Sequence, residues 1–193
     1  MNKPELRTFI RARLATLSPE EIQQKSVRIT ASLLTSDWWQ QAEIVFAFCS
    51  MPDEVETRDL IQAALAQGKK VGIPRIAGER LVFHRLDRLD QDFVMHPYGI
   101  REPAASWPVL NPCNMAGHRL LIITPGLAYD REKHRLGQGK GFYDRFFSQL
   151  ANCPSLNAWR LGVCCSEQLF DKVPTGPHDL PVDAVITEQE TLD

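Results

Sequence analysis

The sequence predicts an α/β fold built around a mostly parallel central sheet. Two observations support this prediction: short apolar runs recur along the chain, and segments with helical periodicity lie between them. Strands that alternate with helices in this way are joined by crossover connections and pair in parallel. The runs expected to form strands are residues 43–48, 70–76, 81–86, 119–124, 159–165 and 183–187.

The expected helices have recognisable starts and stops. Residues 4–17 form the first, with an apolar face made by Leu6, Phe9, Ile10, Leu14 and Leu17. The second should begin at a capping box, in which Ser18 is followed by proline and by Glu21, and run to about Leu34. Asp37 is expected to cap a short turn that holds two tryptophans. Further helices are expected at 58–67, which a glycine ends, and at 141–150.

Residues 87–118 show no clear periodicity and contain many prolines. They are expected to form a long irregular connection over the surface, and loops of that length are often functional. Ligands of open α/β sheets gather beyond the carboxyl ends of the strands. Three segments of interest, at 49–57, 124–144 and 164–168, follow predicted strands.

The composition is that of one soluble globular domain spanning residues 1–193. Hydrophobic residues make up 44% of the chain and charged residues 24%, with a net charge of -2. Such a balance gives no support for a general nucleic-acid or membrane-surface binder. No apolar run approaches the roughly 20 residues of a membrane helix, and the first residues lack a signal core. We therefore expect a cytoplasmic protein, and a monomer.

The five cysteines are Cys49, Cys113, Cys153, Cys164 and Cys165. Their number is odd, and no Cys-x-x-Cys pair is present. Cys164 and Cys165 are adjacent in an apolar run, where side chains alternate between faces, so they are poorly placed to share a metal. We expect all five to be reduced and to serve as small apolar side chains.

The most informative segment is TPGLAYDREKHRLGQGKGFYDRFF, which starts at Thr124. Within ten residues it holds three glycines, the cations Arg135 and Lys140, and the carboxylate Asp144. Glycines allow backbone N–H groups to approach an anion, arginine and lysine bind phosphate, and a carboxylate suits Mg²⁺. This combination is typical of a nucleotide-phosphate cradle with its own metal ligand.

The spacing of the cradle excludes the two common phosphate motifs. A P-loop requires serine or threonine after Gly-Lys, but Gly141 follows Lys140 here. A dinucleotide fingerprint has the spacing Gly-x-Gly-x-x-Gly near the first strand, whereas this Gly-x-Gly-x-Gly lies late in the chain. By spacing alone, a glycine-rich turn before an amphipathic helix remains an equal alternative.

Five motifs in order nevertheless resemble one known family. They are Lys3-Pro-Glu-Leu-Arg7 (K-x-x-L-R), Met51-Pro-Asp-Glu-Val-Glu-Thr57 (D-E-[VI]-[DE]-T), Tyr98-Gly-Ile-Arg-Glu-Pro103 (G-I-x-E-P), PGLAYD with RLGQGKGFYDRF, and His178-Asp179-x-x-Val182-Asp183 (H-D-x-x-V-D). This set is similar to the signature of the 5-formyltetrahydrofolate cyclo-ligases, also called methenyltetrahydrofolate synthetases. The motifs cover nearly the whole chain.

The resemblance implies a ligase of one-carbon metabolism. Such an enzyme uses ATP and Mg²⁺ to convert 5-formyltetrahydrofolate into 5,10-methenyltetrahydrofolate, with release of ADP and phosphate through a phosphorylated formyl intermediate. It also implies a three-layer α/β/α, Rossmann-like fold, similar to sugar isomerases and CoA transferases. The alternative is a non-catalytic phosphate-ligand sensor or regulatory protein on a related α/β fold. An RNA-binding module is disfavoured, because a basic surface and a stacking platform are lacking.

The resemblance also assigns residues to roles. Lys140 and Arg135 would be catalytic, and Asp144 and Asp179 would bind Mg²⁺. The residues implied for ATP are Lys3, Arg7, Arg135, Leu136, Gly137, Gln138, Gly139, Lys140, Gly141, Phe142 and Tyr143. Those implied for the folate are Cys49, Glu54, Gln138, Gly139, Lys140, Gly141 and Phe142.

Several of these residues have plainer alternatives. Lys3 and Arg7 share a helix face, which is equally the pattern of a solvated basic edge. Asp144 has Arg145 beside it as a possible ion-pair partner, and Asp179 suits a turn or a cap. Glu54 is suited to pair with the N–H groups of a pterin.

Other features of these motifs also have two interpretations. Glu56 and Thr57 are alternatives to Glu54, or caps for the helix near position 58. Cys49 is smaller than the apolar residue expected beside a pterin. His134 lies in the cradle, where it contacts either phosphate or solvent. The segment 129–134 departs from the family's usual F-D-x-x-G, which puts the geometry of that turn in doubt.

Overall fold

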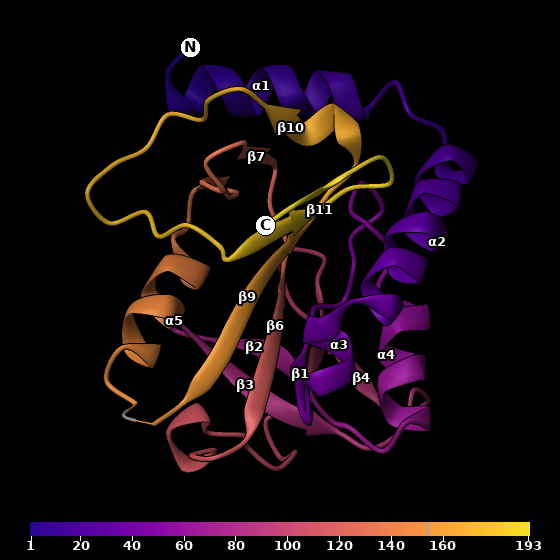
Figure 1. The fold of residues 1–193 in the computed structure, drawn as a ribbon, viewed down its shortest axis with the longest axis vertical. Helices are drawn as coiled ribbons and strands as arrows, with labels where there is room; N and C mark the ends of the chain where they lie inside the picture. The colour runs from indigo at the N-terminus through magenta and orange to yellow at the C-terminus, as the bar shows by residue number, and fades with distance from the viewer. Residues whose placement is uncertain (154) are drawn as a thin grey trace.

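A computed structural model describes residues 1–153 and 155–193 and contains a seven-stranded sheet (Figure 1). The strand order is β12-β11-β9-β6-β1-β2-β3, and the five inner strands are parallel. The edge strands β3 and β12 are antiparallel to their neighbours. The bounds are β1 Ile44–Phe46, β2 Lys70–Ala77, β3 Arg80–Leu86, β6 Arg119–Thr124, β9 Asn157–Val163, β11 Ala184–Ile186 and β12 Thr191–Leu192.

Helices cover both faces of this sheet. Figure 1 shows α2, α3 and α4 on one side and α5 on the other. The bounds are α1 Lys3–Leu14, α2 Pro19–Thr35, α3 Asp37–Gln41, α4 Arg58–Ala66 and α5 Phe142–Leu150. The predicted α/β class with a mostly parallel central sheet is confirmed. None of the helices in the described part of the chain has the length and apolar character needed to cross a membrane.

The strands build two cores by alternation of their side chains. Val45 and Leu121 pack with α2, α3 and α4, whereas Phe46 and Ile122 pack with the aromatic residues of α5. The rings of Phe46 and Phe83 are stacked, with centroids 4.2 Å apart. Because β1 and β6 are buried on both faces, their sequences are continuously apolar, which is why they were visible in the sequence.

Two helix starts follow capping-box chemistry, but the expected cap at Asp37 is wrong: Ser36 is the N-cap of α3, and its hydroxyl accepts a hydrogen bond from the N–H of Trp39. Ser18 and Glu21 form the predicted capping box of α2. A second capping box, made by Asn2 and Glu5, starts α1. Phe9, expected on the inner face of α1, is 47% exposed and packs edge-on against the ring of Phe170 at the margin of the core. The expected inward position of Phe9 is therefore wrong.

The prediction of an irregular connection over 87–118 is also wrong in part. This segment contains an antiparallel hairpin of β4, Phe93–Met95, and β5, Arg101–Pro103, and a short 3-10 helix, Pro112–Asn114. The buried carboxylate of Glu102 accepts a 2.8 Å hydrogen bond from the N–H of Ile76 and so anchors the hairpin to β2. Arg75 adds a 2.8 Å hydrogen bond to the carbonyl of Pro103.

A small second sheet carries the first helix. It consists of β10 Leu169–Phe170, β7 Ala128–Asp130 and β8 Arg135–Leu136. The sequence did not indicate these strands, because each has only two or three residues. The apolar face of α1 packs on this unit, and the contact is made by Leu6, Ile10, Leu14, Leu127, Ala128, Leu136 and Val173. In Figure 1, α1 lies beside β10 and β7, next to the segment that forms the cradle.

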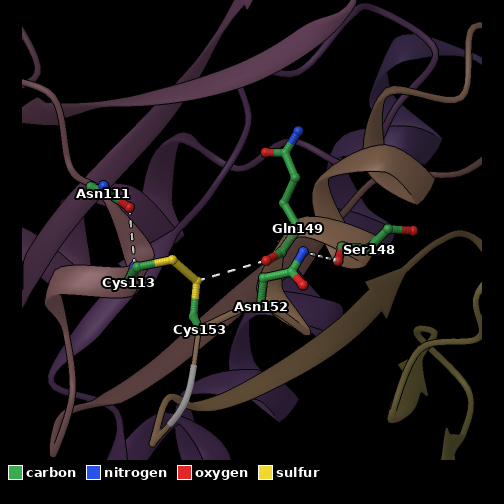
Figure 2. Close-up of a disulfide and its surroundings, with 6 residues drawn as sticks. All are labelled: Asn111, Cys113, Ser148, Gln149, Asn152 and Cys153. Atoms are coloured by element: carbon green, nitrogen blue, oxygen red, sulfur yellow. Dashed lines mark hydrogen bonds between the residues drawn. A yellow bond between two sulfur atoms is a disulfide. The ribbon is translucent and has the colours of Figure 1, made fainter.

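Two of the cysteines are joined, contrary to the expectation that all five are reduced. Cys113 and Cys153 form a disulfide, with Cα atoms 4.6 Å apart, within the range that such a bond requires (Figure 2). The bond links the connection before β6 to the segment after α5. Closing a loop of this size stabilises a fold by about 4 kcal/mol in the chain-entropy description. Cys49, Cys164 and Cys165 are free thiols, as expected.

Candidate active site

A cavity of about 700 Å³ opens beyond the carboxyl ends of β1 and β6. Its walls come from α1, the loop after β1, the β4–β5 hairpin, the cradle and the segment near Asp179. The sequence-predicted residues that line it are Lys3, Arg7, Cys49, Glu54, Arg135, Leu136, Gly137, Gln138, Gly139, Lys140, Gly141, Phe142, Tyr143, Asp144 and Asp179. The chain thus brings all of the predicted site residues to one place.

The backbone of the cradle depends on glycine at two positions. Gly139 and Gly141 have φ angles of 101° and 66°, a region that other residues rarely adopt. Gly141 is the N-cap residue of α5, so the first N–H groups of that helix follow it directly. The first N–H groups of a helix have no acceptor within the helix, so they attract anions. The cradle therefore has the backbone chemistry of a phosphate site.

Helix α1 holds the cradle from the other side. Arg7 donates from Nε to the carbonyl of Gly137 at 2.9 Å, and Arg11 donates to the side chain of Gln138 at 2.7 Å. Lys3 forms an ion pair with Asp179. Lys3 and Arg7 are thus cavity residues with protein partners, not a solvated basic edge. Arg13 fits the plainer interpretation, since it is exposed and does not line the cavity.

The two carboxylates expected to bind metal each have a cationic partner. Arg135 donates a 3.0 Å hydrogen bond to Asp144, and Asp179 accepts from Lys3 and from the N–H of Gly176. Burial opposes ionisation of Asp179, but the hydrogen bonds from Lys3 and Gly176 prevail and lower its pKa. Arg145, the alternative partner of Asp144, instead donates to the carbonyls of Glu79 and Lys140.

The donor set fits a magnesium ion that keeps water and phosphate ligands. Asp144 uses Oδ1, and Asp179 uses Oδ2, for the hydrogen bonds to the protein. The other oxygen of each has no protein hydrogen bond within the described chain. No cluster of three or more acidic, histidine or cysteine side chains suited to a metal occurs among the described residues. Mg²⁺ commonly binds through one or two carboxylates together with substrate phosphates.

The loop after β1 supplies a carboxyl group that is a weaker acid than an ordinary glutamate. Glu54 lines the cavity and accepts a 3.0 Å hydrogen bond from the N–H of Met51. Burial raises the pKa of Glu54 to about 7. Glu56 instead accepts from the N–H of Arg58, at the start of α4, and the hydroxyl of Thr57 donates to the carbonyl of Phe48. Of these three residues, Glu54 is the one placed to contact a ligand.

Two polar groups beneath the cradle lack partners. The guanidinium of Arg135 lies 5.4 Å from the ring centroid of Tyr143. The Nε atom of Arg135 and the hydroxyl of Tyr143 are buried without a hydrogen-bond partner in the described structure. Burial raises the pKa of Cys49, also in the cavity, to about 11, so its thiol stays protonated. The site thus holds unpartnered polar groups but offers no activated nucleophile at Cys49.

Comparison with known proteins identifies the family. The sequence model of the 5-formyltetrahydrofolate cyclo-ligase family matches residues 1–188. The chain belongs to this family. The probable 5-formyltetrahydrofolate cyclo-ligase of Caenorhabditis elegans is 32% identical, with 98% of this chain and 94% of that protein covered. The 5-formyltetrahydrofolate cyclo-ligase of Mus musculus is 29% identical, with 96% and 93% covered.

A solved structure agrees with this assignment. The 5,10-methenyltetrahydrofolate synthetase of Aquifex aeolicus has a TM-score of 0.80 and 28% identity to this chain. The likeness covers 99% of this chain and 92% of that one. The similarity extends from α1 to the carboxy-terminal strands, so the two proteins share the same overall fold.

The 129–134 turn departs from the cyclo-ligase pattern in sequence, but it has a defined geometry. Lys133 stands where F-D-x-x-G has glycine, and its φ angle is 66°. The buried carboxylate of Asp130 holds the turn, because its Oδ1 accepts from the N–H groups of Glu132 and His134 at 3.0 and 2.9 Å. The ring of His134 lies 3.3 Å from Asp130 and does not line the cavity.

Several cavity residues were missed by the sequence analysis. Arg11 follows Arg7 by one helical turn, a spacing that could have revealed it. Tyr98, Ile100 and Arg101 belong to the hairpin, and the G-I-x-E-P motif was their only signal. The segment 164–168 follows a strand as expected, yet it supports the site from behind. There, Gln168 donates a 2.9 Å hydrogen bond to the carbonyl of Gly126.

Proposed function

We propose that this protein converts 5-formyltetrahydrofolate into 5,10-methenyltetrahydrofolate, using ATP and Mg²⁺ and releasing ADP and phosphate. The observation that carries the proposal is the cavity itself. It brings a carboxyl group suited to a pterin, Glu54, into the same space as the glycine cradle and Lys140. Membership of the cyclo-ligase family supports the folate conversion, and the cradle supports the use of a nucleoside triphosphate.

The proposed reaction explains why the pterin end and the phosphate end of the cavity must be close together. The formyl oxygen of the substrate is a poor leaving group. In the proposed reaction this oxygen attacks the γ-phosphorus of ATP, the bond to ADP breaks, and an imino-phosphate forms. N10 then attacks the formyl carbon and loses its proton, while the carbon–oxygen bond breaks and phosphate leaves. Holding two reactants in line is the main task of an enzyme for such a transfer.

The residues of this chain have distinct tasks in that reaction. Glu54, as a carboxylate, accepts hydrogen bonds from the amino and ring N–H groups of the pterin, with Cys49 packed beside it. The N–H groups of Gly139 and Gly141 bind phosphate oxygens, and Lys140 neutralises the group in transfer.

Cations from two further elements complete the phosphate end. Arg7 and Lys3 reach the phosphates from α1, and Arg135 stabilises them from β8. Asp144 and Asp179 would hold Mg²⁺, which would supply charge neutralisation to the phosphates.

One assay tests the overall reaction. Purified protein mixed with 5-formyltetrahydrofolate, ATP and Mg²⁺ should develop the absorbance of the methenyl product, and omission of any one component should prevent it. If the protein binds nucleotide and folate but forms no product, the proposal fails and a non-catalytic sensor is favoured.

A label tests the phosphorylation step separately. A heavy-oxygen label on the formyl group should appear in inorganic phosphate within a single turnover. Label in water instead would mean that ATP drives a conformational step and that the formyl oxygen is never phosphorylated. The absorbance assay and the label therefore contradict different parts of the proposal.

A further inference from the structure

The β4–β5 hairpin forms the wall of the cavity that faces the cradle. Tyr98, Ile100 and Arg101 line the cavity from this side. The Nζ atom of Lys140 lies 5.6 Å from the ring centroid of Tyr98, so the hairpin and the cradle meet across the opening. The ion pair of the buried Glu102 with the partly exposed Arg75, at 3.7 Å, helps to fix the hairpin in this position.

Arg101 is a positioned but unpaired cation. Its guanidinium lies 4.8 Å from the ring centroid of Phe93, and that ring packs edge-on against Trp107 with centroids 5.2 Å apart. No carboxylate of the described chain lies within ion-pairing distance of Arg101, and no described atom accepts a hydrogen bond from its side chain. By contrast, Arg7, Arg11 and Arg135 each donate to a protein oxygen.

The charge of Arg101 acts on the cavity from its rim. The residue is exposed, yet its positive charge partly offsets the rise that burial causes in the pKa of Cys49. The other lysines and arginines of the lining belong to α1 and the cradle. Arg101 is therefore a positive charge on the opposite wall, separate from the cations of α1 and the cradle.

We propose that Arg101 binds the carboxylates of the glutamate tail of the folate and selects for substrates that carry it. This inference rests on the proposed function. A folate has a pterin at one end and a glutamate with two carboxylates at the other, joined through a benzoyl ring. With the pterin against Glu54 and the formyl group at Lys140, the tail leaves the cavity over Tyr98 and Ile100. A guanidinium at the exposed rim matches a carboxylate in a bidentate pair.

The sequence motif agrees with a specificity role. Arg101 occupies the variable position of G-I-x-E-P, whereas the fixed glutamate of that motif, Glu102, anchors the hairpin. The fixed glutamate of the motif thus holds the hairpin in place, whereas the variable position sets the charge that the hairpin presents to the cavity. A different residue at position 101 would change the tail preference without altering the hairpin.

Calorimetric binding to the intact protein tests the proposal. The two ligands are 5-formyltetrahydrofolate and 5-formyltetrahydropteroate, which lacks the glutamate. Wild-type protein should bind the glutamate-bearing ligand about tenfold more tightly. Arg101→Gln should abolish this difference by weakening only the glutamate-bearing ligand, and Arg101→Lys should restore part of it. Arg88→Gln is the control, because Arg88 is an exposed arginine paired with Asp90 outside the cavity.

The outcomes separate this proposal from the proposed function. Equal binding of both ligands by the wild type, or an equal loss for both in Arg101→Gln, would overturn the role of Arg101. Failure to form methenyl product would contradict the proposed function, but the binding comparison would still decide whether Arg101 recognises the tail. Circular dichroism and thermal unfolding of each variant establish that the fold is intact.

Discussion

The guanidinium of Arg135 donates a 3.0 Å hydrogen bond to the carboxylate of Asp144, nine residues along the chain. Both side chains are largely shielded from solvent, with exposed fractions of 5% and 19%. Removing one member of a buried pair leaves an uncompensated charge and costs about 3–5 kcal/mol. Replacement of Arg135 would therefore combine a loss of folding stability with any loss of catalysis. Lys140 gives a cleaner test of the cradle.

Lys140→Ala should lower kcat by about 10²–10³-fold, the effect expected when one group that stabilises a transition state is removed. Lys140 is exposed and its side chain contacts the ring of Tyr98, so the melting temperature should change little. Steady-state kinetics with 5-formyltetrahydrofolate, together with thermal unfolding, measure both effects. Lys172→Ala, at an exposed lysine outside the cavity, is the control. Near-normal turnover in Lys140→Ala would remove Lys140 from the proposed mechanism.

Asp144→Asn and Asp179→Asn should each raise the Mg²⁺ concentration that gives half-maximal activity, and excess Mg²⁺ should restore part of the rate. The reason is that a neutral amide is a weaker ligand for a hard cation than a carboxylate. A Mg²⁺ titration of initial rates at fixed ATP measures the shift. Asp171→Asn provides the control, since the side chain of Asp171 is fully exposed. Titrations identical to wild type in both variants would show that the metal binds elsewhere.

Glu54→Gln should raise the KM for the folate much more than the KM for ATP, because an amide cannot accept the paired hydrogen bonds of a pterin. The pKa of about 7 adds a pH dependence. Binding of the folate to the wild type should weaken as the pH falls below 7, where the carboxyl gains its proton, and this trend should be absent in Glu54→Gln. A larger change in the KM for ATP would move Glu54 away from the pterin.

The raised pKa of Glu54 also makes a prediction about folding. The folded pKa of about 7 exceeds the ordinary value of 4.5, so the folded state binds more protons between these pH values. The free energy of unfolding therefore falls as the pH rises from 4.5 to 7. The Glu54→Gln variant should lack this pH-dependent part of the free energy of unfolding, which is on the order of 2–3 kcal/mol. Urea unfolding of both proteins at pH 5 and pH 8 measures it, and a constant difference between them would contradict the assignment.

Lys133→Gly should stabilise the fold by about 0.5–1 kcal/mol. A residue with a Cβ pays roughly 1–2 kcal/mol in the left-handed region, and part of the gain is lost to the greater freedom of glycine in the unfolded chain. Lys133 has a φ angle of 66°, whereas Lys172 is not among the residues with positive φ. Lys172→Gly should therefore destabilise the protein. Chemical unfolding compares the two, and destabilisation by both would contradict the argument.

The sequence was informative where chemistry or periodicity was concentrated in a continuous segment. The strands β1 and β6 are buried on both faces and stand out as apolar runs, and the cradle stands out by its glycines and charges. The hairpin was missed because β4 and β5 have three residues each and Val94 and Met95 are exposed, so no alternation marks them.

Two other features depend on proximity in space that no local pattern records. The disulfide joins cysteines 40 residues apart, and Lys3 meets Asp179 across 176 residues. The motifs predicted that Lys3 and Asp179 belong to one site, but not that they contact each other directly. Arg101 was overlooked for a related reason: its motif lies in a segment that was expected to be irregular, and only the fold shows that this segment borders the cavity.

The contacts of α1 have a consequence for the order in which the site is completed during synthesis. A ribosome makes Lys3 and Arg7 first, but Gly137 and Asp179, which they contact, emerge much later. Until then α1 also lacks Val173 and the small sheet on which its apolar face packs. A nascent chain therefore has the α1 wall of the cavity without the walls that hold Gly137 and Asp179. Translational arrest before about residue 180 should leave a chain that cannot retain nucleotide, however well its first strands have folded.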